Sequence, residues 1–386
     1  MAQWLRLVTQ STPPHCGYLE ECQAPYRALD RLADETPAIV QLIGSGQKYK
    51  LIDHLFRNGP PTQQSDIIHI VEMQDRKQSI ILFDCPTVLH PSKMDMTMDD
   101  KAGYLHRHPL KGWKLNQSNF QTTVQLNSQL LAGISQTVVV FVDDFPGSSS
   151  IIELLVAWAR NCQRDLRSRP RLLLVSEEYT EKVDMQARFL DRLFRYFVRL
   201  QQMSDPTRPY VPSDVETMFW NCFESLHLIS DCSGLLDRIM LHTQEMLQRR
   251  TTLGWAFSGS NLCYLLRQWI SRFARNEIGA FDFVLAFRTQ DPAAKRFEHH
   301  IEVLLHLTPK PQLAKMAKVV ASALYMDAYP KGGHCPSDEH ILSYVAPRVT
   351  PGSSTSMDGE KKPNIMLCLL VVLPKQGAAM RPLALR

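Results

Sequence analysis

The feature that most constrains this chain is a short apolar segment that ends in glycine and leads into a basic, helix-forming segment. The apolar run Ala38–Ile43 stops at Gly44-Ser45-Gly46, and the helix-like segment Leu51–Phe56 follows after two lysines. Buried strand, glycine-bearing loop, lysine and helix is the order in which proteins hold phosphate, because backbone N–H groups at a helix N-terminus point at the anion. The stretch therefore predicts an α/β fold with a phosphate-binding loop after its first strand.

The loop matches the P-loop pattern G-x-x-x-x-G-K-[ST] only in part. Its first glycine is Gly44 and its lysine is Lys50, but Tyr49 takes the second glycine position and Leu51 the hydroxyl position. Tyr49 adds a ring where the backbone approaches phosphate closely, and Leu51 cannot ligate Mg²⁺ as serine or threonine does. Lys50 is expected to supply the charge, with Lys48 nearby. The residues assigned to phosphate or nucleotide binding are Gly44, Ser45, Gly46, Gln47, Lys48 and Lys50.

Alternating and continuous apolar runs predict six strands. Asp66–Met73 and Ser79–Phe83 are joined by a short polar turn, so they must pair antiparallel. Thr137–Val142 and Arg171–Val175 are continuous apolar runs, as expected for parallel strands covered on both faces. With Ala38–Ile43 and Ser225–Ile229, these runs predict an α/β fold with a doubly wound, mainly parallel six-stranded sheet and one antiparallel strand.

The pattern along the chain predicts four regions. Residues 1–36 are expected to form an N-terminal lead-in and residues 37–232 the α/β domain, in which 90–115 is a long irregular loop. Helical periodicity over 235–249, 260–275, 293–307 and 313–328 predicts an all-helical region at 233–328. Residues 329–386 are rich in glycine, proline, serine and charge, and are expected to form a loop or disordered tail.

With this order of elements, residues 36–232 resemble the G domain of P-loop GTPases. The resemblance implies a nucleotide, GTP or ATP, and a Mg²⁺ ion held by Asp84 after the third predicted strand and by Thr62 in the loop before the second. The base-reading positions of that family fall on Ser176–Tyr179, which does not match, and on Ser230–Cys232, which is only partly compatible. The resemblance therefore implies a degenerate nucleotide site without guanine specificity.

A second resemblance lies in Ala321–His334. This segment is similar to one in large fungal proteins that join a P-loop-like domain and helices to a patatin-like phospholipase domain. The catalytic glycine run and serine of that domain are not in the sequence. The resemblance implies a non-catalytic part of a larger multidomain protein, a truncated relative or a fragment.

Each of these features also has a plainer interpretation. The segment Gly44–Lys50 also fits an ordinary strand-to-helix turn that uses glycine for backbone freedom. Carboxylates at strand ends, such as Asp84, Asp143 and Asp144, often cap helices or face water. The spacing of the group His334, Cys335 and His340 fits no zinc pattern, so a loop is expected there.

Composition excludes several classes of protein. The 386 residues carry 43 basic and 39 acidic side chains, a net charge of +4, and no nucleic-acid-binding motif accompanies the arginines. Nine cysteines without a C-x-x-C pair indicate reduced thiols in a cytoplasmic protein. The apolar run Ile365–Leu373 is far shorter than the roughly 20 residues of a membrane span.

The sequence thus predicts a degenerate P-loop NTPase-like module that at most binds a nucleotide or another phosphate ligand, in a regulatory or scaffolding role. Loss of the Mg²⁺-binding hydroxyl argues against efficient hydrolysis. Two alternatives stay open. One is an active GTP or ATP hydrolase that uses Lys50, Asp84 and Thr62. The other is a protein-interaction module that binds no nucleotide and docks a partner through its helical region.

Overall fold

The computed structural model describes most of the first 277 residues and a few beyond them. The described ranges are 2–9, 17–55, 67–75, 78–88, 105–111, 119–161, 168–177, 183–204, 209–230, 234–253 and 255–277, with 303, 304, 306, 307, 309 and 312. Two compact units divide the chain, Met1–Phe281 and Asp282–Arg386. All elements described below belong to the first unit. The predicted helices 293–307 and 313–328, apart from a few positions, and all of the segment 321–334 lie outside the described residues.

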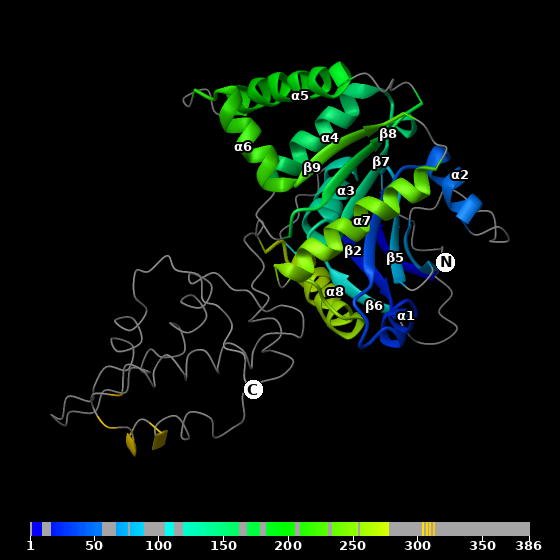
Figure 1. The fold of residues 1–386 in the computed structure, drawn as a ribbon, viewed down its shortest axis with the longest axis vertical. Coiled ribbons are helices and arrows are strands. Elements are labelled where there is room, and N and C mark those ends of the chain that lie inside the picture. The colour runs from blue at the N-terminus through cyan, green and yellow to red at the C-terminus, as the bar shows by residue number, and fades with distance from the viewer. Residues whose placement is uncertain are drawn as a thin grey trace. The chain divides into compact units, whose positions relative to one another are not determined.

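The first unit is a mixed α/β structure around one twisted sheet, which is nine-stranded in the described part of the chain (Figure 1). The order across the sheet is β6-β2-β1-β4-β5-β3-β7-β8-β9. Strands β5, β3, β7, β8 and β9 run parallel, and the other four pair antiparallel. The strands are β1 Ala2–Thr9, β2 Gly17–Cys22, β3 Ala38–Ile43, β4 Ile67–Asp75, β5 Gln78–Cys85, β6 Leu105–Pro109, β7 Thr137–Phe141, β8 Arg171–Val175 and β9 Ser225–Ile229.

The six predicted strands are all present, as β3, β4, β5, β7, β8 and β9. The predicted hairpin is confirmed: β4 and β5 pair antiparallel from His69 opposite Asp84 to Asp75 opposite Gln78. The sheet nevertheless exceeds the predicted six strands, because β1, β2 and β6 extend it beyond β4. The lead-in at 1–36 and the irregular loop at 90–115 thus both supply strands.

Buried charges explain why β1 and β2 escaped the sequence pattern, whereas β6 has no buried residue that could mark it. Arg6 of β1 and Glu20 of β2 are both buried, and the Arg6 Nε donates to a Glu20 carboxylate oxygen at 2.6 Å. Arg107 of β6 donates to the other oxygen of Glu20 at 3.1 Å. A paired charge inside a sheet satisfies its burial but breaks the apolar alternation by which a strand is recognised.

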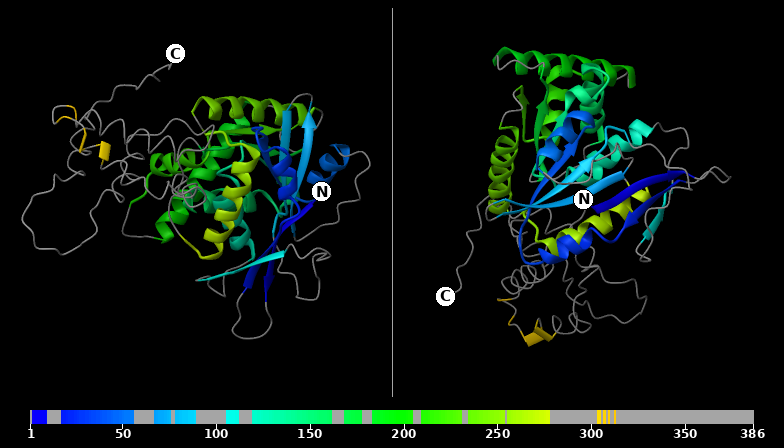
Figure 2. Two further views of the ribbon diagram at one scale, coloured as in Figure 1. Left: turned by 90° about the horizontal axis from the view of Figure 1, so that it is seen from below. Right: turned by 90° about the vertical axis from the view of Figure 1, so that its right-hand side faces the viewer.

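Helices cover both faces of the sheet (Figures 1 and 2). On one face, Ile52 of α2 and Ile239 of α7 pack with Val40, Val139 and Leu173 of the strands. The opposite face is covered by η1 among others, since Gln41, which alternates with Val40, donates to Asn127 of η1 at 3.1 Å. The helices are α1 Tyr26–Arg31, α2 Gly46–Leu55, α3 Asn119–Gln125, α4 Ser148–Asn161, α5 Val183–Ser204, α6 Pro212–Cys222, α7 Leu235–Thr252 and α8 Gly259–Ala274, with the π-helical η1 Leu126–Leu131 and the 3₁₀ turn η2 Val142–Asp144.

The predicted boundary at residue 232 does not separate two units in the structure. Helix α7 packs directly on β3, β7 and β8, and α8 packs on α1. The N–H of Gly259, at the start of α8, donates to the carbonyls of Leu32 and Glu35, which follow α1. The apolar faces of α7 and α8 were visible in the sequence, but the surfaces that they cover are set by tertiary packing.

The chain reverses its direction of travel across the sheet after β3. From β3 it passes through α2 to β4 and β5 on one side, and then crosses to β7 on the other side. The carboxyl ends of β3 and β7 therefore lie at a topological switch point, where open α/β sheets commonly bind ligands.

Candidate functional site

The turn between β3 and α2 is much shorter than a phosphate-wrapping loop. Strand β3 ends at Ile43 and α2 begins at Gly46, so Gly44 and Ser45 alone join them. The sequence predicted that the helix would begin after Lys50, and the structure corrects this to Gly46. Residues Gly46, Gln47, Lys48 and Lys50 thus belong to the first turns of α2 and leave no long loop to fold around a ligand.

A carboxylate from the neighbouring strand occupies the N-terminus of α2. Asp144 lies in the turn η2 after β7, and its Oδ2 accepts the Ser45 N–H at 2.6 Å and the Lys48 N–H at 3.3 Å. Its Oδ1 accepts the Gln47 N–H at 2.8 Å. These N–H groups have no acceptor within the helix and lie at the positive end of its dipole, where a phosphate would otherwise bind. Asp144 therefore caps α2 as an anion of the chain itself.

Gly44 is needed because of this carboxylate. A Cβ placed on Gly44 would lie 2.6 Å from the Asp144 Oδ2 and 3.0 Å from the Cβ of Phe141. A Cβ on Gly46 would lie 3.4 Å from the Asp144 Oδ1, an ordinary contact. The glycine at the end of β3 thus permits the close approach of Asp144 and does not wrap a phosphate.

The buried lysine of the site is Lys48. Its side chain is fully buried, and the Nζ lies 2.6 Å from the Asp84 Oδ1 and donates to the Cys85 carbonyl at 2.7 Å. Lys48 therefore points beneath α2 toward the end of β5. Lys50, to which the sequence assigned the charge, is exposed on α2. Two lysines two residues apart face different sides of a helix. The spacing of the P-loop pattern therefore could not show which of the two points into the interior.

Asp84 is the counter-ion of Lys48. It is 2 % exposed, and its Oδ2 lies 3.5 Å from the His69 Nδ1 of β4. Burial raises the pKa of Asp84, but the nearby His69 and the charge of Lys48 lower it by more, so the pKa lies below the usual value. The carboxylate stays ionised at neutral pH and is compensated within the chain.

The residues present do not fit the Mg²⁺ ion that the resemblance implies. Asp84 already faces an ammonium group, and Thr62 lies outside the described residues. No group of three or more histidine, cysteine, aspartate or glutamate side chains that could hold a metal occurs among the described residues.

The neighbouring strand ends are also closed by internal contacts. Asp143 accepts the Ser176 hydroxyl at 2.5 Å and the Glu177 N–H at 2.9 Å, which ties the end of β7 to the end of β8. Gln47 of α2 donates to the Glu177 carboxylate at 3.2 Å. Ser176 and Glu177, the described part of one segment in which the resemblance would place base recognition, are therefore bonded to their neighbours. Asp143 and Asp144 follow the plainer interpretation of strand-end carboxylates, since both bind backbone N–H groups.

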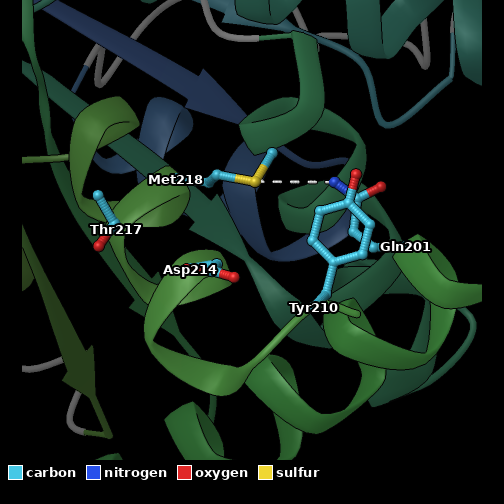
Figure 3. A pocket seen from close by; sticks show the side chains of 5 residues that line it. All are labelled: Gln201, Tyr210, Asp214, Thr217 and Met218. Carbon is cyan, nitrogen blue, oxygen red and sulfur yellow. Dashed lines mark hydrogen bonds between the residues drawn. The ribbon is translucent and has the colours of Figure 1, made fainter. Parts of the chain in front are cut away.

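A hollow of about 300 Å³ lies elsewhere, between α5 and α6 (Figure 3). The Gln201 Nε2 lies 3.7 Å from the Met218 Sδ across it. Its lining is mixed in character and far from the strand ends: Gln201, Tyr210, Asp214, Thr217 and Met218. The hollow does not bring together a set of groups suited to catalysis.

Two further observations concern the cysteines and the hydrophobicity of the helices. The described cysteines Cys22, Cys85, Cys222 and Cys263 are free thiols. Burial raises the pKa of the Cys85 thiol to about 12, which makes it unreactive. Within the described ranges, no helix has the length and apolar character to cross a bilayer.

Comparison with known proteins adds little to this geometry. Neither a protein-family model nor a curated protein matches the sequence. Among solved structures, Toc33 from Arabidopsis thaliana, in complex with GDP and Mg²⁺, is 11% identical, with 67% of this chain and 95% of that chain covered and a TM-score of 0.26. A likeness at this TM-score is too low to carry an argument about fold or ligand.

Proposed function

We propose that this chain is a degenerate P-loop NTPase-like module that does not hydrolyse nucleotide and has a regulatory or scaffolding role. In this module, the Asp144 carboxylate stands where a phosphate group would bind. The observation that carries the proposal is the set of three backbone N–H groups, from Ser45, Gln47 and Lys48, that converge on this carboxylate. An anionic ligand must displace Asp144 before it can reach them.

The electrostatics of the site also disfavour catalysis. Phosphoryl transfer depends on a lysine and a metal ion that neutralise the charge developing on the phosphate oxygens. The Lys48 ammonium is held 2.6 Å from Asp84 and away from the surface, and Leu51 supplies no hydroxyl for a metal. Turning Lys48 outward would leave Asp84 ionised and unpaired in the interior, which is costly.

The two alternatives differ from this proposal in what they require of the site. An active GTP or ATP hydrolase needs Asp144 to leave the N-terminus of α2 and Lys48 to leave Asp84 together. A module that never binds nucleotide keeps both contacts at all times. The contacts of Asp144 with α2 and of Lys48 with Asp84 favour the second alternative over the first. In a scaffolding role, the chain would bind a partner protein and no nucleotide.

The proposal is tested by titrating the wild-type chain with fluorescent GTP and ATP analogues, with and without Mg²⁺, and by assaying phosphate release. The expected result is no saturable binding at concentrations on the order of 100 µM and no turnover above background. Turnover that Asp84→Ala abolishes would favour the active hydrolase and overturn the proposal. Saturable binding without turnover would contradict the expectation that Asp144 keeps a phosphate from the N-terminus of α2. A cytoplasmic location stays a prediction from the cysteine pattern.

A further inference from the structure

Helix α5 carries four arginines on one exposed face. Arg188, Arg192, Arg195 and Arg199 follow the spacing i, i+4, i+7 and i+11, which places them along one side of a helix over about 16 Å. All four are exposed. We refer to these four residues as the arginine stripe.

The opposite face of α5 is already used for packing. Phe189, Leu193 and Phe197 are buried, and α5 packs against α4 and α6. Figure 1 and the right-hand view of Figure 2 show α5 at one end of the first unit, at the opposite end from α1. The arginine stripe therefore lies on the side of α5 away from its packing face.

The charges of the stripe are only partly compensated. Asp184 pairs with Arg188 at 3.4 Å and Asp191 with Arg195 at 2.9 Å, both at the i,i+4 spacing and both highly exposed. Such exposed pairs are weak and exchange readily with other partners. Across the described residues, Arg192 and Arg199 make no ion pair, so two guanidinium groups on this face are without a carboxylate.

We propose that the arginine stripe is a docking surface for an acidic helical segment of a partner protein, with carboxylates spaced to meet Arg192 and Arg199. Guanidinium groups bind carboxylates in a planar, two-pronged geometry, and all four cations here are arginine. A helix is the fitting occupant because its own i, i+4, i+7 carboxylates repeat at the same intervals as the stripe. Such docking requires neither a movement of Asp144 nor a bound nucleotide.

Two other anionic surfaces fit this face less well. A membrane-surface helix needs a free apolar face to insert, and the apolar face of α5 is buried on α4 and α6. A nucleic acid would place phosphates against Asp184 and Asp191, which lie among the arginines, and the net charge of +4 is small for such a partner. A protein helix can instead offer a cation to these two aspartates as well as carboxylates to the arginines.

The test uses a fluorescein-labelled helical peptide with glutamates at i, i+4, i+7 and i+11, titrated with the full chain and followed by anisotropy. We expect saturable binding that weakens as salt rises, and about fivefold weaker binding by Arg192→Gln/Arg199→Gln. A peptide of the same composition with scrambled spacing should bind no better than that variant. The matched control is Arg31→Gln/Arg275→Gln, which removes two exposed charges elsewhere and should bind like wild type.

The affinity of the chain for the spaced peptide is compared with its affinity for inorganic polyphosphate and for vesicles of phosphatidylserine and phosphatidylcholine. Equal binding by the Arg192→Gln/Arg199→Gln variant would overturn the proposal, as would equal binding of the scrambled peptide. Stronger binding of polyphosphate or of the vesicles than of the spaced peptide would assign the stripe to a different partner and would also overturn it. Because all four positions are exposed, the variants should keep the wild-type circular dichroism and unfolding midpoint.

Discussion

The Nζ of Lys48 lies 2.6 Å from the Asp84 Oδ1, and both side chains are almost completely buried. This pair joins α2 to the end of β5 and uses the cation that a phosphate-binding loop would offer to its ligand. Asp144 caps the same helix, so the charged groups at the ends of β3, β5 and β7 are paired within the chain and need no ligand. The consequences of this arrangement can be measured one residue at a time.

Replacing Lys48 tests the pair most simply. Lys48→Met leaves Asp84 buried without its cation, and we expect this to lower the free energy of unfolding by about 3–5 kcal/mol. Lys50→Met, two residues along the same helix, removes an exposed charge and should change it by less than about 0.5 kcal/mol. Urea unfolding of the two variants makes the comparison. A larger loss of unfolding free energy for Lys50→Met than for Lys48→Met would mean that Lys50 is the lysine that points into the interior.

Removing both members of the pair tests whether the cost comes from the unpaired charge. Lys48→Met/Asp84→Leu leaves no isolated charge in the interior, so we expect it to be more stable than Lys48→Met alone. The same unfolding measurement completes a double-mutant cycle. If the double variant is as unstable as the sum of the single variants, the two residues do not interact as the structure describes.

Substituting Gly44, which follows β3, should lower the stability of the protein far more than substituting Gly46. Gly44→Ala forces a Cβ against the Asp144 carboxylate at 2.6 Å, and we expect a loss of about 1–3 kcal/mol. Gly46→Ala introduces an ordinary contact at 3.4 Å within a helix, where alanine is favoured over glycine by up to about 1 kcal/mol. Thermal unfolding should place Gly44→Ala below the wild type and Gly46→Ala level with it or above. The reverse order would mean that Asp144 does not approach Gly44.

A pair of histidines predicts a dependence of stability on pH. His227 of β9 and His242 of α7 are in ring contact with centroids 4.6 Å apart, and Arg171 donates to the His242 Nδ1 at 2.8 Å. Since arginine only donates, that nitrogen must be unprotonated. Burial, the neighbouring His227 and Arg171 lower the pKa of His242 to about 4, and burial and Arg171 lower the pKa of His227.

The sign of the effect follows from proton binding. Between the unfolded pKa of about 6.5 and the folded value, the unfolded chain binds more protons, so stability is complete above that range and falls as pH drops through it. Unfolding free energies measured from pH 7.5 to 4.5 should therefore decline less steeply for His242→Gln than for wild type. Parallel curves for the two proteins would contradict the assignment of a neutral His242.

The strand-and-hairpin framework could be predicted from the sequence because its signals are local. The alternation in Asp66–Met73, the short turn after it and the continuous apolar runs each determine one element and its neighbour. The strands β1 and β2 could not be predicted in this way, because Arg6 and Glu20 neutralise each other only when the two strands pair.

The sequence placed the candidate site at the turn between β3 and α2, and assigned its residues from a motif whose spacing presumes a loop. Once α2 begins at Gly46, the inward-facing lysine is Lys48, and Lys50 faces solvent. The role of Asp144 depends on β7 lying beside β3, a contact between residues about 100 positions apart, for which the sequence offers no local signal beyond a carboxylate at a strand end.

The central claim is that the Asp144 carboxylate keeps phosphate from the N-terminus of α2, and calorimetric titration with inorganic pyrophosphate tests it most directly. Asp144→Ala frees the three N–H groups, whereas the matched control Asp143→Ala removes the adjacent carboxylate, which binds Ser176 and Glu177. Circular dichroism establishes that both variants keep their helices. The account predicts saturable pyrophosphate binding by Asp144→Ala and none by wild type or Asp143→Ala. Indistinguishable titrations of the three proteins, whether all bind or none does, would contradict it.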